Sequence, residues 1–143
     1  MHCDARVKTV CGDVMNLPRH QVRALSPQEL GFSVILSDMC PLVSGITTKD
    51  AALSAELGMQ ALDLAVGRTA LSIKNSERGG QLDGTDYGLL QHGGHLVIKL
   101  LESEDVQEFR RICKPLFRKA AWLRPKATRS SSKEIYLICQ GLL

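Results

Sequence analysis

The 143-residue sequence predicts an α/β fold in which a buried sheet carries charged residues at its strand ends. Two stretches lead to this prediction. Residues 32–37 (Phe-Ser-Val-Ile-Leu-Ser) are apolar or small, as in a strand buried on both faces, and Asp38 follows them. Residues 95–98 (His-Leu-Val-Ile) form a second such run, and Lys99 follows it. Ligands bind at the carboxyl ends of strands in open α/β sheets, so Asp38 and Lys99 are candidate site residues.

Length and composition are those of one ordinary globular domain. Hydrophobic residues make up 44% of the chain and charged residues 23%. The five cysteines form no Cys-x-x-Cys pair, so we expect reduced thiols and no metal site. No apolar run reaches membrane-spanning length, and the first residues are typical of neither a signal nor a transit peptide. The compartment therefore stays open among cytoplasm, nucleus and an organelle such as the mitochondrion.

The first 31 residues predict a short strand and two short helical pieces. Residues 7–11 alternate like a strand that ends at Gly12, which makes Asp13 a second strand-end carboxylate. Residues 20–30 have helical spacing, but Pro27 limits them to two pieces.

The middle of the chain predicts an amphipathic helix and then a flexible insertion. Residues 50–69 have apolar positions at helical spacing, and Asp50 lies in the first turn. We expect the helix to pack on the sheet through Leu53, Leu57, Ala61, Leu64 and Ala65. Residues 72–88 are polar and Gly-rich, which predicts a flexible insertion within one domain.

The last third predicts a helix and two more strands. A Gly-Gly turn at 93–94 precedes the strand at 95–98, and a helix at 103–119 is bent or divided by Pro115. A short strand at 120–123, a basic loop and a last strand at 134–139 follow. If the last strand is antiparallel, Glu134 at its start lies at the same rim as Asp38 and Lys99.

A lysine between two carboxylates has two interpretations. It can hold a substrate hydroxyl, and it can take the hydroxyl proton if its own pKa is lowered. The alternative is a structural ion-pair network at a sheet edge. Spacing alone leaves both open.

Basic residues are concentrated in a window that contains no acid. Half of the 18 Lys and Arg lie there: Arg110, Arg111, Lys114, Arg118, Lys119, Arg124, Lys126, Arg129 and Lys133. This asymmetry indicates a polyanion partner, RNA or DNA first, although a solvated helix face is the commoner origin of a charge run.

Four motifs, in this order, resemble the FtsJ/RrmJ family of S-adenosylmethionine-dependent RNA ribose 2′-O-methyltransferases. They are Phe-Ser-Val-Ile-Leu-Ser-Asp-Met-Cys-Pro at 32–41, Ser-Gly-Ile-Thr-Thr at 44–48, Gly-Gly-His-Leu-Val-Ile-Lys-Leu at 93–100, and Arg-Pro-Lys-Ala-Thr-Arg-Ser-Ser-Ser-Lys-Glu-Ile-Tyr at 124–136. The resemblance implies a Rossmann-like methyltransferase sheet with an antiparallel last strand. It also implies S-adenosylmethionine as cofactor and RNA, most often ribosomal RNA, as substrate.

The resemblance assigns roles to particular residues. The family uses a Lys-Asp-Lys-Glu tetrad to orient and deprotonate a ribose 2′-hydroxyl, and Asp38, Lys99 and Glu134 match its last three members. Lys99 would be the nearest group to a general base, and Asp38 would also lie beside the methionine end of the cofactor. Asp13 matches a carboxylate that accepts a hydrogen bond from the adenine amino group. In the basic loop, the resemblance implies RNA phosphate contacts by Lys126, Arg129 and Arg124.

One departure from the family pattern concerns the N-terminus. In the family the first tetrad lysine, a Gly-rich cofactor loop and a ribose-binding carboxylate precede the Gly-Asp pair, whereas only eleven residues precede Gly12 here. We therefore expect an incomplete methyltransferase domain over residues 1–143, as in a fragment, a splice form or a truncated gene product.

An incomplete sheet leaves three hypotheses about function open. The strand at 32–37 would expose an edge and leave an apolar face bare, which favours self-association. The first hypothesis is an RNA 2′-O-methyltransferase that is active or inactive as this chain. The second is a non-catalytic RNA-binding or partner-binding remnant, and the third is a nonfunctional fragment.

Overall fold

The structure, a computed structural model, describes residues 5–39, 47–67, 88–124 and 133–143. Its sheet has four strands in the order β1-β2-β4-β3. The strands are β1 (Phe32–Ser37), β2 (Leu90–Leu101), β3 (Phe117–Leu123) and β4 (Glu134–Leu142). β1 runs parallel to β2, and β4 is antiparallel to both of its neighbours. The predicted α/β class and the antiparallel last strand are confirmed.

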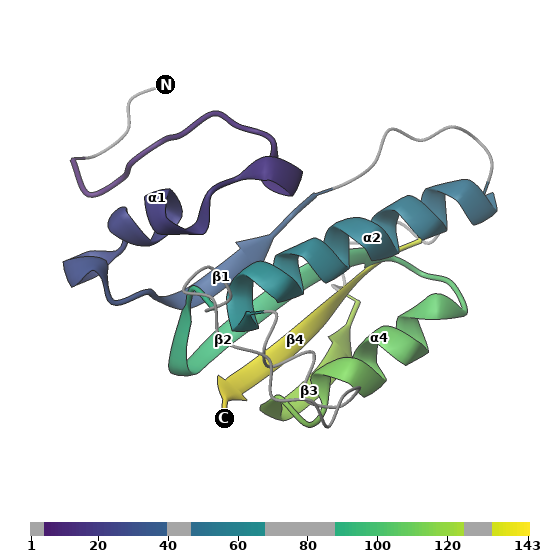
Figure 1. Ribbon diagram of the computed structural model, residues 1–143. Helices are drawn as coiled ribbons and strands as arrows, with labels where there is room; N and C mark the ends of the chain where they lie inside the picture. The colour runs from purple at the N-terminus through teal and green to yellow at the C-terminus, as the bar shows by residue number, and fades with distance from the viewer. Residues whose placement is uncertain (1–4, 40–46, 68–87, 125–132) are drawn as a thin grey trace, which may run out of the picture.

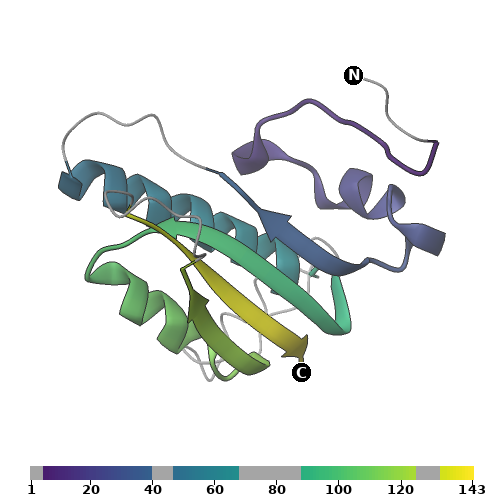
Figure 2. The same cartoon turned by 180° about the vertical axis from the view of Figure 1, so that it is seen from behind.

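Two long helices cover one face of the sheet (Figure 1). They are α2 (Thr47–Val66) and α4 (Asp105–Cys113). A shorter α1 (Arg19–Ala24), with the 3-10 turns η1 (Val14–Asn16) and η2 (Pro27–Glu29), lies beyond the β1 edge in both views (Figures 1 and 2). Within the described ranges no helix has the length and apolar character needed to cross a bilayer.

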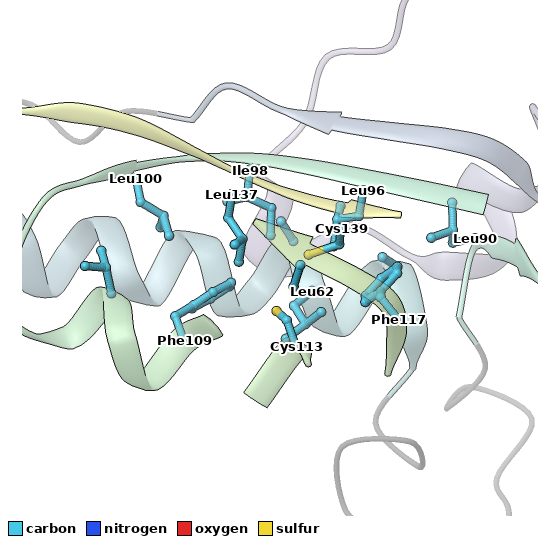
Figure 3. Packing of buried hydrophobic residues seen from close by; sticks show 14 of the residues in the cluster. Leu62, Leu90, Leu96, Ile98, Leu100, Phe109, Cys113, Phe117, Leu137 and Cys139 are labelled. Carbon is cyan, nitrogen blue, oxygen red and sulfur yellow. The ribbon is translucent and has the colours of Figure 1, made fainter. Parts of the chain in front are cut away.

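The hydrophobic core lies between the sheet and the two long helices (Figure 3). Its largest fully buried side chains are Phe117, Leu62, Leu96, Ile98, Leu137, Cys113 and Cys139. Alternate residues of a strand face opposite sides of a sheet. Since Leu96, Ile98 and Leu100 of β2 face the helices, Lys99 faces the other side, where the described residues place neither α2 nor α4.

The buried stripe of α2 differs in part from the predicted one. Ala61 and Ala65 are buried as expected, but Leu53 is 37% exposed and Leu62, which the periodicity did not single out, is fully buried. Small residues let the helix approach β2 closely. Ser54 Oγ accepts a hydrogen bond from the Leu101 amide at 2.9 Å, and a Cβ on Gly58 would lie 2.7 Å from a Leu100 methyl carbon.

The predicted strand at 7–11 is wrong. These residues belong to no strand, because none of the described strands pairs with them. Asp13 therefore does not end a strand. It caps η1 instead, where its side chain accepts a hydrogen bond from the Met15 amide at 3.0 Å.

Two element boundaries in the last third also differ from prediction. The glycines at 93–94 lie inside β2, which is much longer than the four residues expected. They fall where the β1–β2 register shifts, and Gly93 has a φ of +80° that suits glycine. Helix α4 ends at Cys113 rather than bending, since Pro115 has no amide hydrogen to continue it, and β3 begins at Phe117. The predicted insertion at 72–88 lies, except for Gly88, outside the described residues.

Candidate active site

Asp38, Lys99 and Glu134 meet at one end of the sheet. Lys99 Nζ lies 2.5 Å from Asp38 Oδ1 and 3.8 Å from Glu134 Oε1. The antiparallel β2–β4 pairing, which sets Glu134 opposite Leu101, brings the start of β4 to the end of β2. Strand alternation then puts Lys99 and Glu134 on the same face. The expected meeting of the three side chains is thus found, while their catalytic role stays a prediction.

Lys99 is the least exposed member of this cluster. Its side chain is 15% exposed, against 41% for Glu134 and 76% for Asp38. The hydrogen bond that Lys99 donates to the Asp38 carboxylate raises the pKa of Lys99 above its ordinary 10.5. Burial opposes this shift, and the charge of Glu134 raises the pKa further. The amine is therefore held as an ammonium ion. In this arrangement it is a fixed hydrogen-bond donor, and the lowered pKa that a proton acceptor needs is not present.

Sequence reasoning missed Tyr136 at this rim. Tyr136 of β4 pairs directly with Lys99 of β2 and is half-buried. The signal was available, because a residue two positions after Glu134 in a strand lies on the same face. Tyr136 is thus the neighbour of Lys99 on the adjacent strand, and its charge adds to the raised pKa of the amine.

A cavity of about 310 Å³ is lined by residues that lie close to Asp13 in the sequence. It is lined by Val10, Gly12, Val14, Leu17, Gln21, Val22 and Leu25. The apolar walls fit a flat heterocycle such as adenine. The exposed Asp13 carboxylate accepts bonds from Met15 and Asn16 and still has lone pairs for a third donor. Asp13 is not among the residues that line the cavity, so its contact with the adenine amino group of S-adenosylmethionine stays a prediction.

Contacts with α2 fix the segment that carries Asp13. Arg19 Nη2 lies 2.6 Å from Asp63 Oδ2, and both side chains are nearly buried. Gln60 of the same helix donates to the Val14 carbonyl at 3.2 Å. In Figures 1 and 2, η1 accordingly lies at the end of the molecule where the chain leaves β1 toward Asp38.

Of the three predicted RNA contacts, only Arg124 is described. It follows β3, and its guanidinium forms a 2.8 Å ion pair with Glu102, which follows β2. Arg124 therefore lies at the same sheet end as Lys99. Lys126 and Arg129 lie outside the described residues. In the described part of the chain, no group of three or more His, Cys, Asp or Glu residues could hold a metal ion.

Comparison with known proteins relates this site to one family. The sequence profile of the family described as FtsJ-like methyltransferase matches residues 1–142. Three similar proteins share the name ribosomal RNA large subunit methyltransferase E. The protein of Halorubrum lacusprofundi is 32% identical over 97% of this chain and 44% of its own length. The Anaplasma marginale protein is 36% identical over 78% of this chain and 45% of its own length. The Desulfosudis oleivorans protein is 31% identical over 96% of this chain and 55% of its own length. The chain thus spans about half the length of these relatives.

A solved structure supports the fold. The crystal structure of a Plasmodium falciparum protein assigned as a ribosomal RNA methyltransferase superposes with a TM-score of 0.62. The match is 19% identical and covers 90% of this chain and 56% of that one. Membership of a methyltransferase family implies a methyl donor. On the match of the profile over nearly the whole sequence, the chain belongs to the FtsJ-like methyltransferase family.

Proposed function

We propose that the protein is an RNA ribose 2′-O-methyltransferase that uses S-adenosylmethionine and acts on ribosomal RNA. The observation that carries this proposal is Lys99, held between Asp38 and Glu134 at the strand ends. The names of the relatives support ribosomal RNA as the substrate. The residues around Asp13 and the exposed Asp38 carboxylate support binding of the cofactor at this end of the sheet.

Lys99 orients the ribose hydroxyl. When bound, S-adenosylmethionine supplies an electrophilic methyl carbon on a positively charged sulfur. Lys99 donates a hydrogen bond to the ribose oxygen, and Asp38 and Glu134 hold the amine in place for this contact. Lys99 lies in β2, Glu134 begins β4 and Asp38 directly follows β1, and these positions favour a fixed orientation.

The exposure of Asp38 explains how Lys99 can also take a proton. The positively charged sulfur of a bound cofactor would compete with Lys99 for the Asp38 carboxylate, whose hydrogen bond is the main cause of the raised pKa of the amine. Weakening this contact lowers the pKa of Lys99. Once it had lost one proton to solvent, the amine would accept the hydroxyl proton. The bond from oxygen to the methyl carbon would form as the bond from that carbon to sulfur broke, with its electron pair going to sulfur.

Titration of the 143-residue chain with S-adenosylmethionine tests the cofactor site. We expect saturable heat of binding, and we expect Asp13→Ala to weaken it about 10- to 150-fold, the loss of one hydrogen bond to a charged acceptor. Asp13 also caps η1. Asp13→Ser is therefore the control, because serine keeps the cap but removes the carboxylate. If Asp13→Ser binds like the unchanged chain, the carboxylate does not contact the ligand.

A chain that does not bind S-adenosylmethionine would support the other hypothesis. It would then be a non-catalytic RNA-binding or partner-binding member of the family. Fluorescence anisotropy with a labelled RNA separates the two cases, since only the second predicts RNA binding without cofactor binding.

We also propose that the protein self-associates through the edge of β1. In the described part of the chain β1 pairs only with β2, so its other side has free amide and carbonyl groups. The strand has no charged residue, and Val34 and Leu36 are 47% and 73% exposed. Uncharged free edges pair readily with other strands. In an antiparallel pair of β1 strands centred on Ile35, each Asp38 lies opposite Phe32, so the two carboxylates do not repel each other.

Sedimentation velocity at increasing protein concentration tests this self-association. We expect a dimer that Leu36→Lys converts to a monomer, because charged side chains block edge pairing. Leu143→Lys is the matched control, since Leu143 is also 63% exposed but lies outside β1. A monomer at all concentrations, or equal effects of both substitutions, would contradict the proposal.

A further inference from the structure

The outer edge of β3 is strongly basic, unlike the uncharged edge of β1. Arg118 and Lys119 are exposed on β3, and Lys114 is exposed in the turn that leads into it. Arg110 of α4 reaches this edge, where its Nε donates to the Ala120 carbonyl at 3.2 Å. Residues 110–119 thus hold five cations, which are these four and Arg111.

Three of these cations have no acidic partner in the part of the chain that the structure describes. Among the described residues, no carboxylate forms an ion pair with Lys114, Arg118 or Lys119. By contrast, Arg111 pairs with Glu108 and Arg124 pairs with Glu102. An uncompensated group of cations attracts a polyanion more strongly than one already neutralised by carboxylates.

The position of these cations relative to Lys99 is set by β3. Lys119 lies opposite Gln140 of β4, and the stem of Arg118 lies against Gly141. Both positions are at the sheet end away from the active-site rim. β3 runs from there to Arg124, which is beside the rim. At a rise of about 3.3 Å per residue, Lys119 and Arg124 are roughly 16 Å apart.

We propose that Lys114, Arg118 and Lys119, with Arg110 beside them, bind phosphates of the substrate RNA at a distance from the methylated ribose. This inference rests on the proposed function. It adds a second contact region, formed by four residues of the basic window, at a distance from the strand-end motifs. In this proposal the RNA strand runs along β3. The basic edge then holds the part of the RNA that extends beyond the active-site rim. Such contacts position the RNA without reading its sequence.

Another role for these charges is protection of an edge strand against aggregation. Protection needs charge at the edge but no bound phosphate. The two roles therefore differ in how RNA affinity depends on salt, because each phosphate contact releases counterions when it forms.

The test is the salt dependence of RNA affinity for the double variant Lys114→Gln and Lys119→Gln. Affinity for a labelled 20-nucleotide single-stranded RNA is measured by fluorescence anisotropy from low to moderate salt. Losing two phosphate contacts should reduce the slope of log affinity against log salt by about 1.4, and should weaken binding roughly 25-fold at 0.1 M salt. Arg110 is left unchanged because it holds the β3 backbone.

The matched control is Lys8→Gln with Lys49→Gln, which removes the same charge from two exposed lysines elsewhere. An equal loss of slope in both double variants would show a net-charge effect and overturn the proposal. Absence of RNA binding by the unchanged chain would overturn it as well. Failure of the proposed methyltransferase function is seen separately, in the S-adenosylmethionine titration, because that measurement contains no RNA.

Discussion

Replacing Lys99 by alanine is expected to lower the rate of methyl transfer about 10²- to 10⁴-fold, the usual contribution of a positioned proton-transfer group. The substitution removes the amine that we propose orients the ribose hydroxyl, and it leaves Asp38 and Glu134 without the cation between them. RNA affinity should change little, since Lys99 is mostly buried at the rim. The measurement is single-turnover transfer of a labelled methyl group at saturating RNA.

Lys49→Ala controls for the loss of one lysine. Lys49 is exposed on α2, which covers the face of the sheet opposite to Lys99, so its substitution should leave the rate unchanged. A Lys99→Ala protein that turns over at a near-normal rate would contradict the role of Lys99. It would favour the structural ion-pair network instead.

The arginine variant separates orientation from proton transfer. Arginine keeps a positive charge and donates hydrogen bonds, but it does not lose a proton in the accessible pH range. If Lys99 accepts the hydroxyl proton, Lys99→Arg should be nearly as slow as Lys99→Ala, and the unchanged protein should become faster as pH rises. Near-normal transfer by Lys99→Arg would show that a positive charge at this position supports methyl transfer without accepting the hydroxyl proton.

The raised pKa of Lys99 also has a consequence for stability. The ion pair with Asp38 favours the protonated amine in the folded state. Its stabilising contribution is therefore complete below the ordinary pKa of 10.5 and is lost as pH rises through the higher folded value. As pH rises through this range, the amine loses its proton and can act as a base. The same deprotonation removes the ion pair that holds the amine beside Asp38.

The second large effect is expected from Leu62→Ala in the core. Leu62 is fully buried between α2 and the sheet (Figure 3). Removing a buried leucine side chain costs about 2–5 kcal/mol in the free energy of unfolding. For a chain of 143 residues this corresponds to a fall in Tm of about 7–17 °C. Thermal unfolding followed by circular dichroism measures the change.

Leu53→Ala is the matched control on the same helix. Leu53 is 37% exposed, so the same truncation should cost less than about 1 kcal/mol. The apolar periodicity predicted Leu53, not Leu62, on the buried face. Equal destabilisation by the two substitutions would contradict the observed orientation of α2.

The orientation of α2 shows why periodicity was not sufficient. The apolar residues of this helix extend around more than one face, so several orientations agree with the pattern. The small residues Ser54 and Gly58 decide among them, because they allow the helix to lie close to Leu100 and Leu101 of β2. Their role depends on the shape of the opposing surface, which belongs to a different part of the chain.

The strand predicted at 7–11 failed for a related reason. Alternating side chains describe a segment that could pair, but a strand exists only where a second strand supplies the hydrogen bonds. No described strand does so here. The residues that follow are held instead by the Arg19–Asp63 ion pair and by the hydrogen bond from Gln60 to the Val14 carbonyl, contacts between residues more than 40 positions apart.

The sequence by itself determined the α/β class, the three charged strand ends and the family. Apolar runs, the residues that end them and ordered motifs are local properties of the chain, so they are readable without coordinates. It also predicted that an antiparallel last strand brings Glu134 to Asp38 and Lys99. Only the tertiary structure decided the protonation of Lys99, the place of Tyr136 and the buried face of α2. These depend on distances between residues far apart in the chain, such as the 2.5 Å from Lys99 to Asp38, and packing alone sets such distances.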